Sequence, residues 1–386
     1  MSPDGRPPRR VLACPQEFKG SLTAIEAAAA IAAGVRAVLP NAEVIELPMA
    51  DGGPGTVAIV ARATGADLVR HTASGPLGDP IEATYALLRR DGMPTLAVIE
   101  AAATAGLLLI ADRRDPARAS SAGVGEQIRH AIERGARQVI VGVGGTATND
   151  GGAGAASALG LRLIDDNGAP LPRGPLQLMR LARVEASTDP AMRDLDLRIA
   201  VDVRNPLLGA NGATAVYGAQ KGVAAWQAPA FNAALAHWAH QLRDDLASER
   251  DRDVAALPGS GAGGGIPTGL LAACPRGRIE SGAALVAEAI GLRAAIEAAD
   301  LVVTGEGALD AQTAYGKAVA HVAMLAADAG TPCLAVAGVV EGLPFGILDA
   351  EALAETATDL DAAMRSAAAH TAAAAARLIH RRLSST

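Results

Sequence analysis

Residues 9–49 read RRVLACPQEFKGSLTAIEAAAAIAAGVRAVLPNAEVIELPM, and the order of patterns in this stretch decides the fold. The apolar run at 9–15 is typical of a buried strand, the alanine-rich segment 21–40 of a helix, and the run at 42–49 of a second strand. A further helical pattern covers residues 55–66 and ends near a glycine. Strands that alternate with helices predict βα units, which build a parallel sheet.

The pattern changes at residues 67–88, where two extended runs flank a Gly/Pro turn and predict an antiparallel pair of strands. An α/β pattern then resumes. Strands are expected at 95–102, 137–143, 161–165, 299–310 and 331–339, and helices at 123–136, 153–160 and 316–330. The tail, residues 352–384, predicts a pair of helices with a basic end.

We therefore expect an α/β protein with two domains. Residues 1–70 and 285–386 are predicted to form a Rossmann-like or flavodoxin-like parallel-sheet domain, and residues 71–284 a second α/β domain inserted into it. The insertion is inferred from the change in strand pattern, and two sequential domains also fit the sequence. The chain has 386 residues, of which 50% are apolar, and this is enough for two hydrophobic cores.

Composition excludes several classes of protein. A net charge of −7 and an aromatic content of 2% argue against a nucleic-acid partner. No stretch reaches the roughly 18 uncharged apolar residues of a membrane span, and residues 1–10 lack the apolar segment of a signal peptide and predict a disordered tail. Cys14, Cys274 and Cys333 are widely spaced, which argues against a zinc site and predicts reduced thiols in a cytoplasmic protein. The sequence leaves the oligomeric state open.

A glycine-rich loop at residues 141–154, VGVGGTATNDGGAG, has Asp150 as its only ionisable side chain. One interpretation is a dinucleotide site, because residues 142–147 fit G-x-G-x-x-G/A and Asp165 follows at the expected distance. In that motif a helix must already have begun at the third small residue, whereas here the turn sequence Asn-Asp-Gly-Gly follows at once. An NAD-dependent oxidoreductase of a small hydroxy acid therefore stays an alternative only.

The second interpretation is a loop that binds phosphate groups through backbone N–H groups ahead of a helix. A bare carboxylate about 4 Å from a phosphate charge costs on the order of 4 kcal/mol at an effective dielectric near 20, more than a helix terminus of about half a charge offsets. Asp150 then needs a magnesium ion or a lysine beside it, or it faces a substrate hydroxyl, and either arrangement indicates phosphoryl transfer. An ordinary glycine-rich turn is the third interpretation. The predicted cofactor-binding residues in this loop are Gly144, Gly145, Thr146, Thr148, Asn149, Asp150 and Gly151.

Only three of the 34 basic residues are lysines, and each of them neighbours a glycine. Such positions suit a compact ammonium group that a planar guanidinium cannot replace. These lysines are Lys19, Lys221 and Lys317. Acidic and amide side chains recur in other glycine-containing loops after predicted strands, at Asp51, Asp202, Asn205, Glu306 and Asp310. None of the loops has the spacing of a P-loop.

Taken in order, these segments resemble the bacterial glycerate kinase family, of the type related to glycerate 2-kinases. The resembling segments are FKGSLTA (18–24), PMADGGPGT (48–56), GVGGTATNDGGAGAASALG (142–160), DVRNPLLGANGATAVYGAQKG (202–222), GSGAGGG (259–265) and TGEGALDAQTAYGK (304–317). The resemblance implies ATP-dependent phosphorylation of D-glycerate, usually to 2-phosphoglycerate, in a cleft between two α/β domains.

The chain departs from the family pattern at Gln16, Pro54 and Ala308, where the family often has an acidic residue, a glutamate and a basic residue. These changes leave the substrate preference open, and a non-catalytic binding protein with the same fold is a further alternative. The sequence also does not decide which hydroxyl of the acid receives the phosphate.

Each predicted site residue has a role in this hypothesis. The predicted catalytic residues are Asp202, which accepts or orients the hydroxyl proton, and Lys19 and Lys221. Ser21 and Lys317 join the glycine-rich loop in binding ATP. The predicted substrate contacts are Asp51, Gly52, Asn205 and Glu306. The predicted ligands of Mg²⁺, directly or through water, are Asp51, Asp202 and Asp310.

Overall fold

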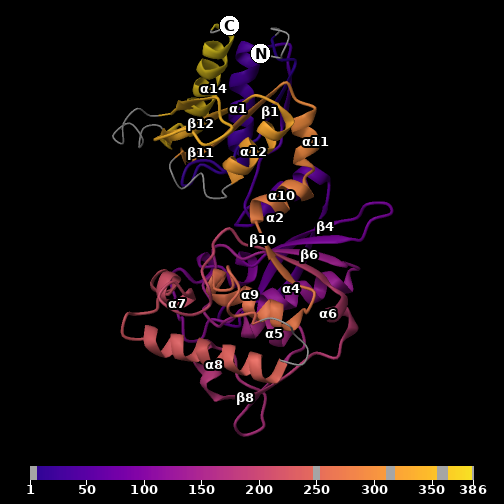
Figure 1. The fold of residues 1–386 in the computed structure, drawn as a ribbon, viewed down its shortest axis with the longest axis vertical. Helices are drawn as coiled ribbons and strands as arrows, with labels where there is room; N and C mark the ends of the chain where they lie inside the picture. The colour runs from indigo at the N-terminus through magenta and orange to yellow at the C-terminus, as the bar shows by residue number, and fades with distance from the viewer. Residues whose placement is uncertain (1–6, 247–252, 310–317, 354–363, 385–386) are drawn as a thin grey trace. The chain divides into compact units, whose positions relative to one another are not determined.

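The computed structural model describes residues 7–246, 253–309, 318–353 and 364–384 (Figure 1). Contacts between Cα atoms divide the chain into two units. The first unit comprises Met1–Asp51, Arg62–Thr64 and Ala283–Thr386, and the second comprises Gly52–Ala61 and Gly65–Gly282. Both units are α/β and contain parallel strands, as predicted. The domain boundaries near residues 70 and 285 stay predictions.

The first unit contains a five-stranded parallel sheet in the order β13-β12-β11-β1-β2. Its strands are β1 (Arg10–Ala13), β2 (Glu43–Glu46), β11 (Leu301–Leu309), β12 (Cys333–Val340) and β13 (Asp349–Ala352). Numbered along the chain within this unit, the order is 2-1-3-4-5, which is the flavodoxin-like arrangement. Strand β1 therefore pairs with β2 on one side and with β11 on the other.

Two alanine-rich helices, α1 (Ala24–Val38) and α14 (Ala367–Ser384), pack side by side against this sheet (Figure 1). Small side chains allow the close approach: a Cβ on Gly34 of α1 would lie 2.1 Å from the carbonyl oxygen of Ala372. A capping box between Thr23 and Glu26 fixes the start of α1, because each side chain satisfies a backbone N–H of the first turn. Further helices of this unit are α10 (Gly282–Ala289), which begins in the last residue of the second unit, α11 (Leu292–Glu297) and α12 (Ala318–Ala329), which packs on β11 and β12.

The second unit contains a six-stranded mixed sheet in the order β10-β9-β6-β5-β4-β3. Its strands are β3 (Asp67–Ser74), β4 (Pro80–Leu88), β5 (Leu96–Glu100), β6 (Gln138–Gly142), β9 (Asp196–Ala200) and β10 (Arg278–Glu280). The antiparallel pairing of β3 with β4 confirms the interpretation of residues 67–88. From β5 to β10 neighbouring strands are parallel, so β6 and β9 end at the same edge of the sheet.

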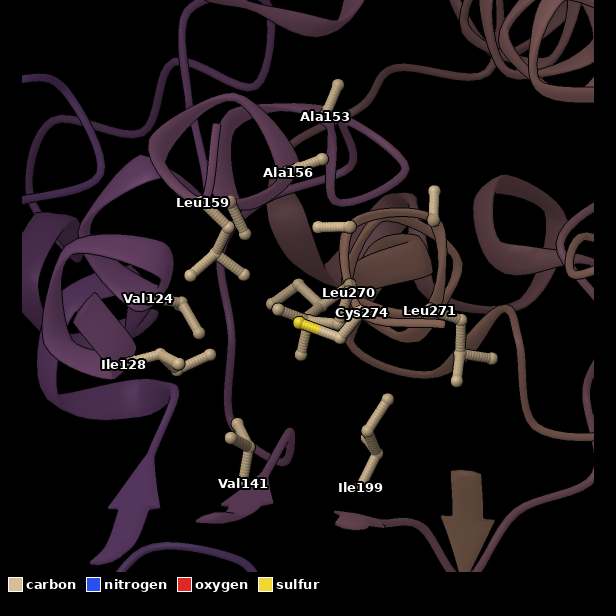
Figure 2. Close-up of a cluster of buried hydrophobic side chains, with 14 of the residues drawn as sticks. Val124, Ile128, Val141, Ala153, Ala156, Leu159, Ile199, Leu270, Leu271 and Cys274 are labelled. Carbon is tan, nitrogen blue, oxygen red and sulfur yellow. The ribbon is translucent and has the colours of Figure 1, made fainter. Parts of the chain in front are cut away.

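Helices α4 (Ala122–Glu133), α5 (Ala153–Ala158) and α9 (Ala262–Ala273) enclose the core of the second unit with β6 and β9. Figure 2 shows Val124, Ile128 and Leu159 meeting Leu270 and Cys274 in this cluster. The small residues of α5 let it pack closely on both α4 and α9. The core thus fixes the start of α5, where the glycine-rich loop ends.

The other elements surround these two sheets. Strands β7 (Arg162–Asp165) and β8 (Leu181–Glu185) form a separate antiparallel pair, so the strand predicted at 161–165 does not join the main sheet. The remaining α-helices are α2 (Thr56–Thr64), α3 (Ala102–Ala105), α6 (Pro190–Asp194), α7 (Ala213–Tyr217) and α8 (Ala228–Leu246), and the 3₁₀ helices are η1 (Leu108–Ile110), η2 (Pro175–Arg180) and η3 (Ala219–Lys221). Of the two helices predicted for the tail, α14 is observed, and residues 354–363 lie outside the described residues. Among the described helices, none has both the length and the apolar character needed to cross a bilayer.

Candidate active site

A cavity of about 290 Å³ lies in the first unit at the point where β1 and β11 end. The residues around it include Gln16, Lys19, Ser21, Asp51, Glu306 and Gly307. From β1 the chain continues to β2, and from β11 it continues to β12, so the two connections run in opposite directions along the sheet. Open α/β sheets bind ligands at such a switch point, beyond the carboxyl ends of the strands. The topology therefore makes this cavity a candidate binding site.

A tight turn brings two predicted site residues to the cavity. Backbone hydrogen bonds of 2.9 Å and 3.0 Å between Phe18 and Leu22 close the turn. Gly20 lies within it at φ +80°, a conformation that glycine adopts without strain. The turn leaves the Lys19 side chain exposed beside the cavity and the Ser21 hydroxyl donating a 3.0 Å hydrogen bond to the Phe18 carbonyl oxygen. Lys19 is thus placed to meet an anionic ligand.

Gln16 pairs with Asp51 at the same cavity. The N–H of Gln16 donates a 2.8 Å hydrogen bond to the carbonyl oxygen of Gly305, which extends the β1–β11 ladder by one step. Its side-chain Nε2 donates a 2.9 Å hydrogen bond to Oδ2 of Asp51. Glu306, which follows Gly305 in β11, is buried and also lines the cavity. From the sequence, Gln16 stood out only as a departure from the family pattern, although its place directly after an apolar strand was a signal for a site residue.

In the second unit, most glycines of the loop at residues 141–154 allow close contact between parts of the protein itself. A Cβ on Gly142 would lie 1.7 Å from the carbonyl oxygen of Gly52. Gly151 has φ +64°, and a Cβ there would lie 2.6 Å from Cδ1 of Trp238. Such distances leave no room for any side chain, so these glycines are needed for packing. A role of Gly151 and Gly52 in ligand binding stays a prediction.

Asp150 organises the same loop from inside the protein. Its Oδ2 accepts hydrogen bonds from the N–H (2.8 Å) and the hydroxyl (2.9 Å) of Ser121 and from the N–H of Gly154 (3.2 Å), and its Oδ1 from the N–H of Gly152 (3.1 Å). The side chain is 1% exposed, and this burial raises its pKa while the four hydrogen bonds lower it. The sequence suggested a carboxylate that faces a ligand. Its observed hydrogen bonds instead connect α4 and α5, because the N–H groups that begin both helices are its donors.

Lys221 is buried beside this loop. Its Nζ donates a 2.6 Å hydrogen bond to the carbonyl oxygen of Thr148 and lies 3.4 Å from Oγ1 of Thr146. Burial lowers the pKa of Lys221 from 10.5 to about 7, and the negative charge of Asp150 opposes this shift. Thr146 in turn donates a 3.0 Å hydrogen bond to the carbonyl oxygen of Gly263. Lys221 therefore holds the glycine-rich loop at Thr148, while Thr146 joins the same loop to the start of α9.

Several groups of the glycine-rich loop retain the capacity to bind a ligand. Gly144 and Gly145 are exposed, and their N–H groups donate no hydrogen bond to any described residue. Thr148 Oγ1 and Asn149 Oδ1 are buried and have no hydrogen-bond partner among the described residues. The amide nitrogen of the same side chain, Asn149 Nδ2, donates a 2.9 Å hydrogen bond to Oγ1 of Thr214. Exposed backbone N–H groups of this kind are suited to an anion.

Asp202 and Asn205 follow β9 at the edge where β6 also ends. Oδ1 of Asp202 accepts 2.9 Å hydrogen bonds from the hydroxyl of Ser281 and the N–H of Gly282. Oδ1 of Asn205 accepts a 2.7 Å hydrogen bond from the hydroxyl of Tyr217. Both side chains are thus held in fixed orientations by neighbouring hydroxyl groups.

The predicted site residues fall into two groups, one in each unit. The cavity of the first unit brings together Lys19, Ser21, Asp51 and Glu306. The second unit contains Gly52, Gly144, Gly145, Thr146, Thr148, Asn149, Asp150, Gly151, Asp202, Asn205 and Lys221. Asp310 and Lys317 lie outside the described residues. The assignment of ligands to these residues stays a prediction.

Asp165, the acidic residue of the alternative dinucleotide motif, has a structural role. Its Oδ1 accepts hydrogen bonds from the N–H groups of Ala169 (2.9 Å) and Asn167 (3.0 Å), and its Oδ2 one from Arg180 (2.6 Å). These interactions, that from Ala169 foremost, lower the pKa of Asp165 and close the turn after β7. Helix α5 begins only after Gly152, as predicted. Neither feature fits a dinucleotide-binding strand–turn–helix.

Comparison with known proteins gives a family. The family model described as the glycerate kinase family matches residues 11–383. A glycerate kinase from Halalkalibacterium halodurans is 42% identical over 330 residues, which cover 85% of each chain. A glycerate 2-kinase from Escherichia coli is 39% identical over 333 residues, again 85% of each chain.

A solved structure agrees with these relatives. A crystal structure from Salmonella typhimurium LT2, assigned as a glycerate kinase 2, superposes with a TM-score of 0.85 at 36% identity and covers 97% of this chain and 98% of its own. The relatives named as glycerate kinases and the solved structure define the class as phosphotransferases. The chain belongs to the glycerate kinase family.

Proposed function

We propose that the chain transfers the terminal phosphoryl group of ATP to D-glycerate and forms 2-phosphoglycerate, with Mg²⁺ as the metal. Membership of the glycerate kinase family supports the reaction class. The observation that carries the proposal is the cavity at the switch point of the first unit, which combines one ammonium group with hydrogen-bond acceptors. Such a set of groups is complementary to a small hydroxy acid.

In this proposal D-glycerate binds in the cavity of the first unit. Lys19 pairs with its carboxylate, Asp51 accepts a hydrogen bond from one of its two hydroxyl groups, and Glu306 lies beside them in the cavity lining. All three residues line the cavity, and its volume of about 290 Å³ admits a three-carbon acid. A ligand carboxylate close to two protein carboxylates is repelled unless a positive charge lies beside it. This requirement explains why a lysine is needed at position 19.

The phosphates of ATP bind to the glycine-rich loop of the second unit. The exposed N–H groups of Gly144 and Gly145 are the donors, and the hydroxyl of Thr148 adds a third. Lys221 stabilises the loop that carries these donors, because its Nζ donates a hydrogen bond to the Thr148 carbonyl oxygen. When it is protonated, it also places a positive charge at the loop. Preorganised donors of this kind stabilise the charge of a phosphoryl group in transfer.

Magnesium fits the donor chemistry of the proposed site. Among the described residues, no three His, Cys, Asp or Glu side chains cluster as a metal site. Mg²⁺ does not need such a cluster, because it is usually bound by one or two carboxylates together with phosphate oxygens and water. Asp51 and Asp202, with Asp310, are the carboxylates that would hold it. When bound, the ion neutralises negative charge on the phosphate oxygens.

Asp202 is the proposed acceptor of the hydroxyl proton. Ser281 and Gly282 hold its Oδ1, so the orientation of the carboxylate is set before the substrate binds. A carboxylate in a fixed orientation can accept the proton as the hydroxyl oxygen attacks the phosphorus atom. The proton leaves the hydroxyl, the new O–P bond forms, and the bond from phosphorus to the oxygen of ADP breaks.

An assay of ADP release tests the proposal. The purified chain is incubated with ATP, MgCl₂ and D-glycerate, and in parallel with hydroxypyruvate or tartronate, and the product is identified by ³¹P NMR. We expect ADP release to depend on D-glycerate and on Mg²⁺ and the product to be 2-phosphoglycerate. If ATP is not consumed with any of these acids, the proposed reaction is wrong; if the product is 3-phosphoglycerate, only the position of transfer is wrong.

A further inference from the structure

Gln16 lines the cavity, and only the nitrogen of its side-chain amide makes a hydrogen bond. Its Nε2 donates a 2.9 Å hydrogen bond to Asp51. Gln16 as a whole is buried, with 8% of its surface exposed. The amide oxygen Oε1 is buried and accepts no hydrogen bond from any residue that the structure describes. A buried acceptor without a donor costs free energy, so this oxygen indicates a missing donor.

The pairing with Asp51 fixes the direction of the amide. An ionised carboxylate only accepts hydrogen bonds, so Gln16 must present its NH₂ group to Asp51 and direct Oε1 elsewhere. A ligand that donates to Oε1 must carry an N–H or O–H group. A carboxylate ion offers no such donor at neutral pH and is excluded from this position, as is a phosphate oxygen that carries no proton.

Two neighbouring side chains of the cavity lining therefore carry acceptors: the buried Oε1 of Gln16 and the carboxylate of Asp51, to which Gln16 donates. They are separated only by the amide group and one hydrogen bond, which suits two hydroxyl groups on adjacent carbon atoms. We propose that Gln16 and Asp51 together bind a vicinal diol, in which one hydroxyl donates to Gln16 Oε1 and the other to Asp51. Gln16 is then a specificity-determining residue.

The diol is assigned to the acceptor acid, and this assignment rests on the proposed function. D-Glycerate carries hydroxyl groups on adjacent carbons together with a carboxylate, and Lys19 lines the same cavity. The ribose of ATP also has a vicinal diol, but it carries no charge of its own for Lys19 to neutralise. Lys19 therefore favours the acid as the source of the diol.

An amide at position 16 has an advantage over a carboxylate. Two carboxylates at hydrogen-bond distance share a proton, because like charges at that distance raise the pKa of one of them. With Gln16 in place of a carboxylate, no like charge faces Asp51 at this point, and Oε1 is an amide oxygen that accepts a hydrogen bond without carrying a proton.

The test compares ligands that lack one hydroxyl group with a protein variant that lacks the Gln16 amide. Each change is measured alone, and the two are then combined. Calorimetric titration measures the Kd of D-glycerate, of D-lactate, which lacks the 3-hydroxyl, and of 3-hydroxypropanoate, which lacks the 2-hydroxyl. One of the two shortened acids lacks the hydroxyl that donates to Gln16. We expect the wild-type protein to bind that acid about tenfold more weakly than D-glycerate, because this hydrogen bond is lost. In Gln16→Met, whose side chain has similar length and no amide, that same hydroxyl should contribute less than about twofold.

Gln138→Met is the matched control. Gln138 Nε2 makes the same kind of hydrogen bond, 3.0 Å long, to Asp196 Oδ2 in the second unit. This variant should discriminate among the three acids as the wild-type protein does. Gln16→Glu is the second test variant, because it retains an acceptor oxygen. It should bind all three acids more weakly, owing to the added charge, yet keep part of the discrimination.

Two results would overturn the inference. If Gln16→Met weakens the binding of all three acids by the same factor, Gln16 contacts no ligand hydroxyl. If Gln16→Met instead removes the preference for ATP over 2′-deoxy-ATP or 3′-deoxy-ATP, the diol is that of ribose, and its assignment to the acid is wrong. These titrations require no turnover, so a wild-type protein that releases no ADP contradicts the proposed function and leaves the hydroxyl comparison readable.

Discussion

The ammonium group of Lys221 donates a 2.6 Å hydrogen bond to the carbonyl oxygen of Thr148 from a position that is 2% exposed. When Lys221 is protonated, a positive charge lies inside the second unit at the base of the glycine-rich loop. Burial of a charge is costly unless partners compensate it, and Asp150 supplies an opposite charge that opposes the fall in pKa. The stability of the loop is therefore coupled to pH.

The first prediction concerns this pH dependence. Burial lowers the pKa of Lys221 to about 7, against 10.5 for an ordinary lysine. Between these values the unfolded chain binds more protons than the folded one, so this residue makes the free energy of unfolding rise with pH by up to about 1.4 kcal/mol per pH unit. Lys221→Met lacks this contribution. Urea denaturation at pH 7, 8 and 9 should show the wild-type protein gaining stability relative to the variant; a constant difference would contradict the buried charge.

The second prediction separates a structural role of Asp150 from a role in ligand binding. The carboxylate of Asp150 accepts hydrogen bonds from backbone N–H groups at both of its oxygens. In Asp150→Asn one of these oxygens becomes an NH₂ group, which faces an N–H group and cannot accept from it, so the free energy of unfolding should fall by about 2 kcal/mol. Ser121→Ala removes one of the four hydrogen bonds that Asp150 accepts together with the 3.0 Å hydrogen bond that the hydroxyl accepts from the N–H of Ala155, and should cost about 1–2 kcal/mol. Both values come from urea denaturation. An Asp150→Asn protein of wild-type stability would show that the observed hydrogen bonds are not the reason for this carboxylate.

The third prediction tests Asp202 as the proton acceptor. Asparagine retains an oxygen for the hydrogen bonds from Ser281 and Gly282, so Asp202→Asn should fold normally and lose only the charge. We expect kcat to fall by about a hundredfold or more, the range of a lost general base. Steady-state kinetics with D-glycerate, together with a thermal melt, provide the measurement. Turnover at the wild-type rate would remove the assignment.

The fourth prediction concerns the approach of Gly142 to Gly52. A Cβ at position 142 would lie 1.7 Å from the Gly52 carbonyl oxygen, a distance that no side chain tolerates. Gly142→Ala should therefore lower the free energy of unfolding by about 2 kcal/mol or more. Gly342→Ala is the control, because a Cβ at that position meets nothing within 4 Å and its φ is not left-handed. Equal stability of the two variants would contradict the observed packing.

Much of the fold follows from local patterns in the sequence. The switch from alternating strands and helices to two extended runs predicted the antiparallel pair β3 and β4, and the turn Asn-Asp-Gly-Gly predicted that α5 begins only after Gly152. These features depend on neighbours in the chain, and propensity and periodicity report on such neighbours. The pairing of β7 with β8 depends on contacts between segments far apart in the sequence, and no local pattern indicated it.

The candidate site was predicted less completely, for the same physical reason. Glycines alone suggested a phosphate, but a sequence does not show that Gly142 approaches Gly52 or that Trp238 lies against Gly151. The pairing of Asp150 with Ser121 was equally invisible, since burial and hydrogen-bond partners are properties of the folded chain. The site residues that share the cavity of the first unit come from the segment after β1, the segment after β2 and strand β11.

The sheet order of the first unit has a consequence for synthesis on the ribosome. Strand β2 leaves the exit tunnel soon after β1, but the partner on the other side of β1, strand β11, begins only at Leu301. All of the second unit is translated in between, and its strands can pair while β1 still has one open edge. Strand β1 thus receives its second partner only after the whole second unit has been made, and in a nascent chain that stalls before Leu301 one edge of β1 has no native partner.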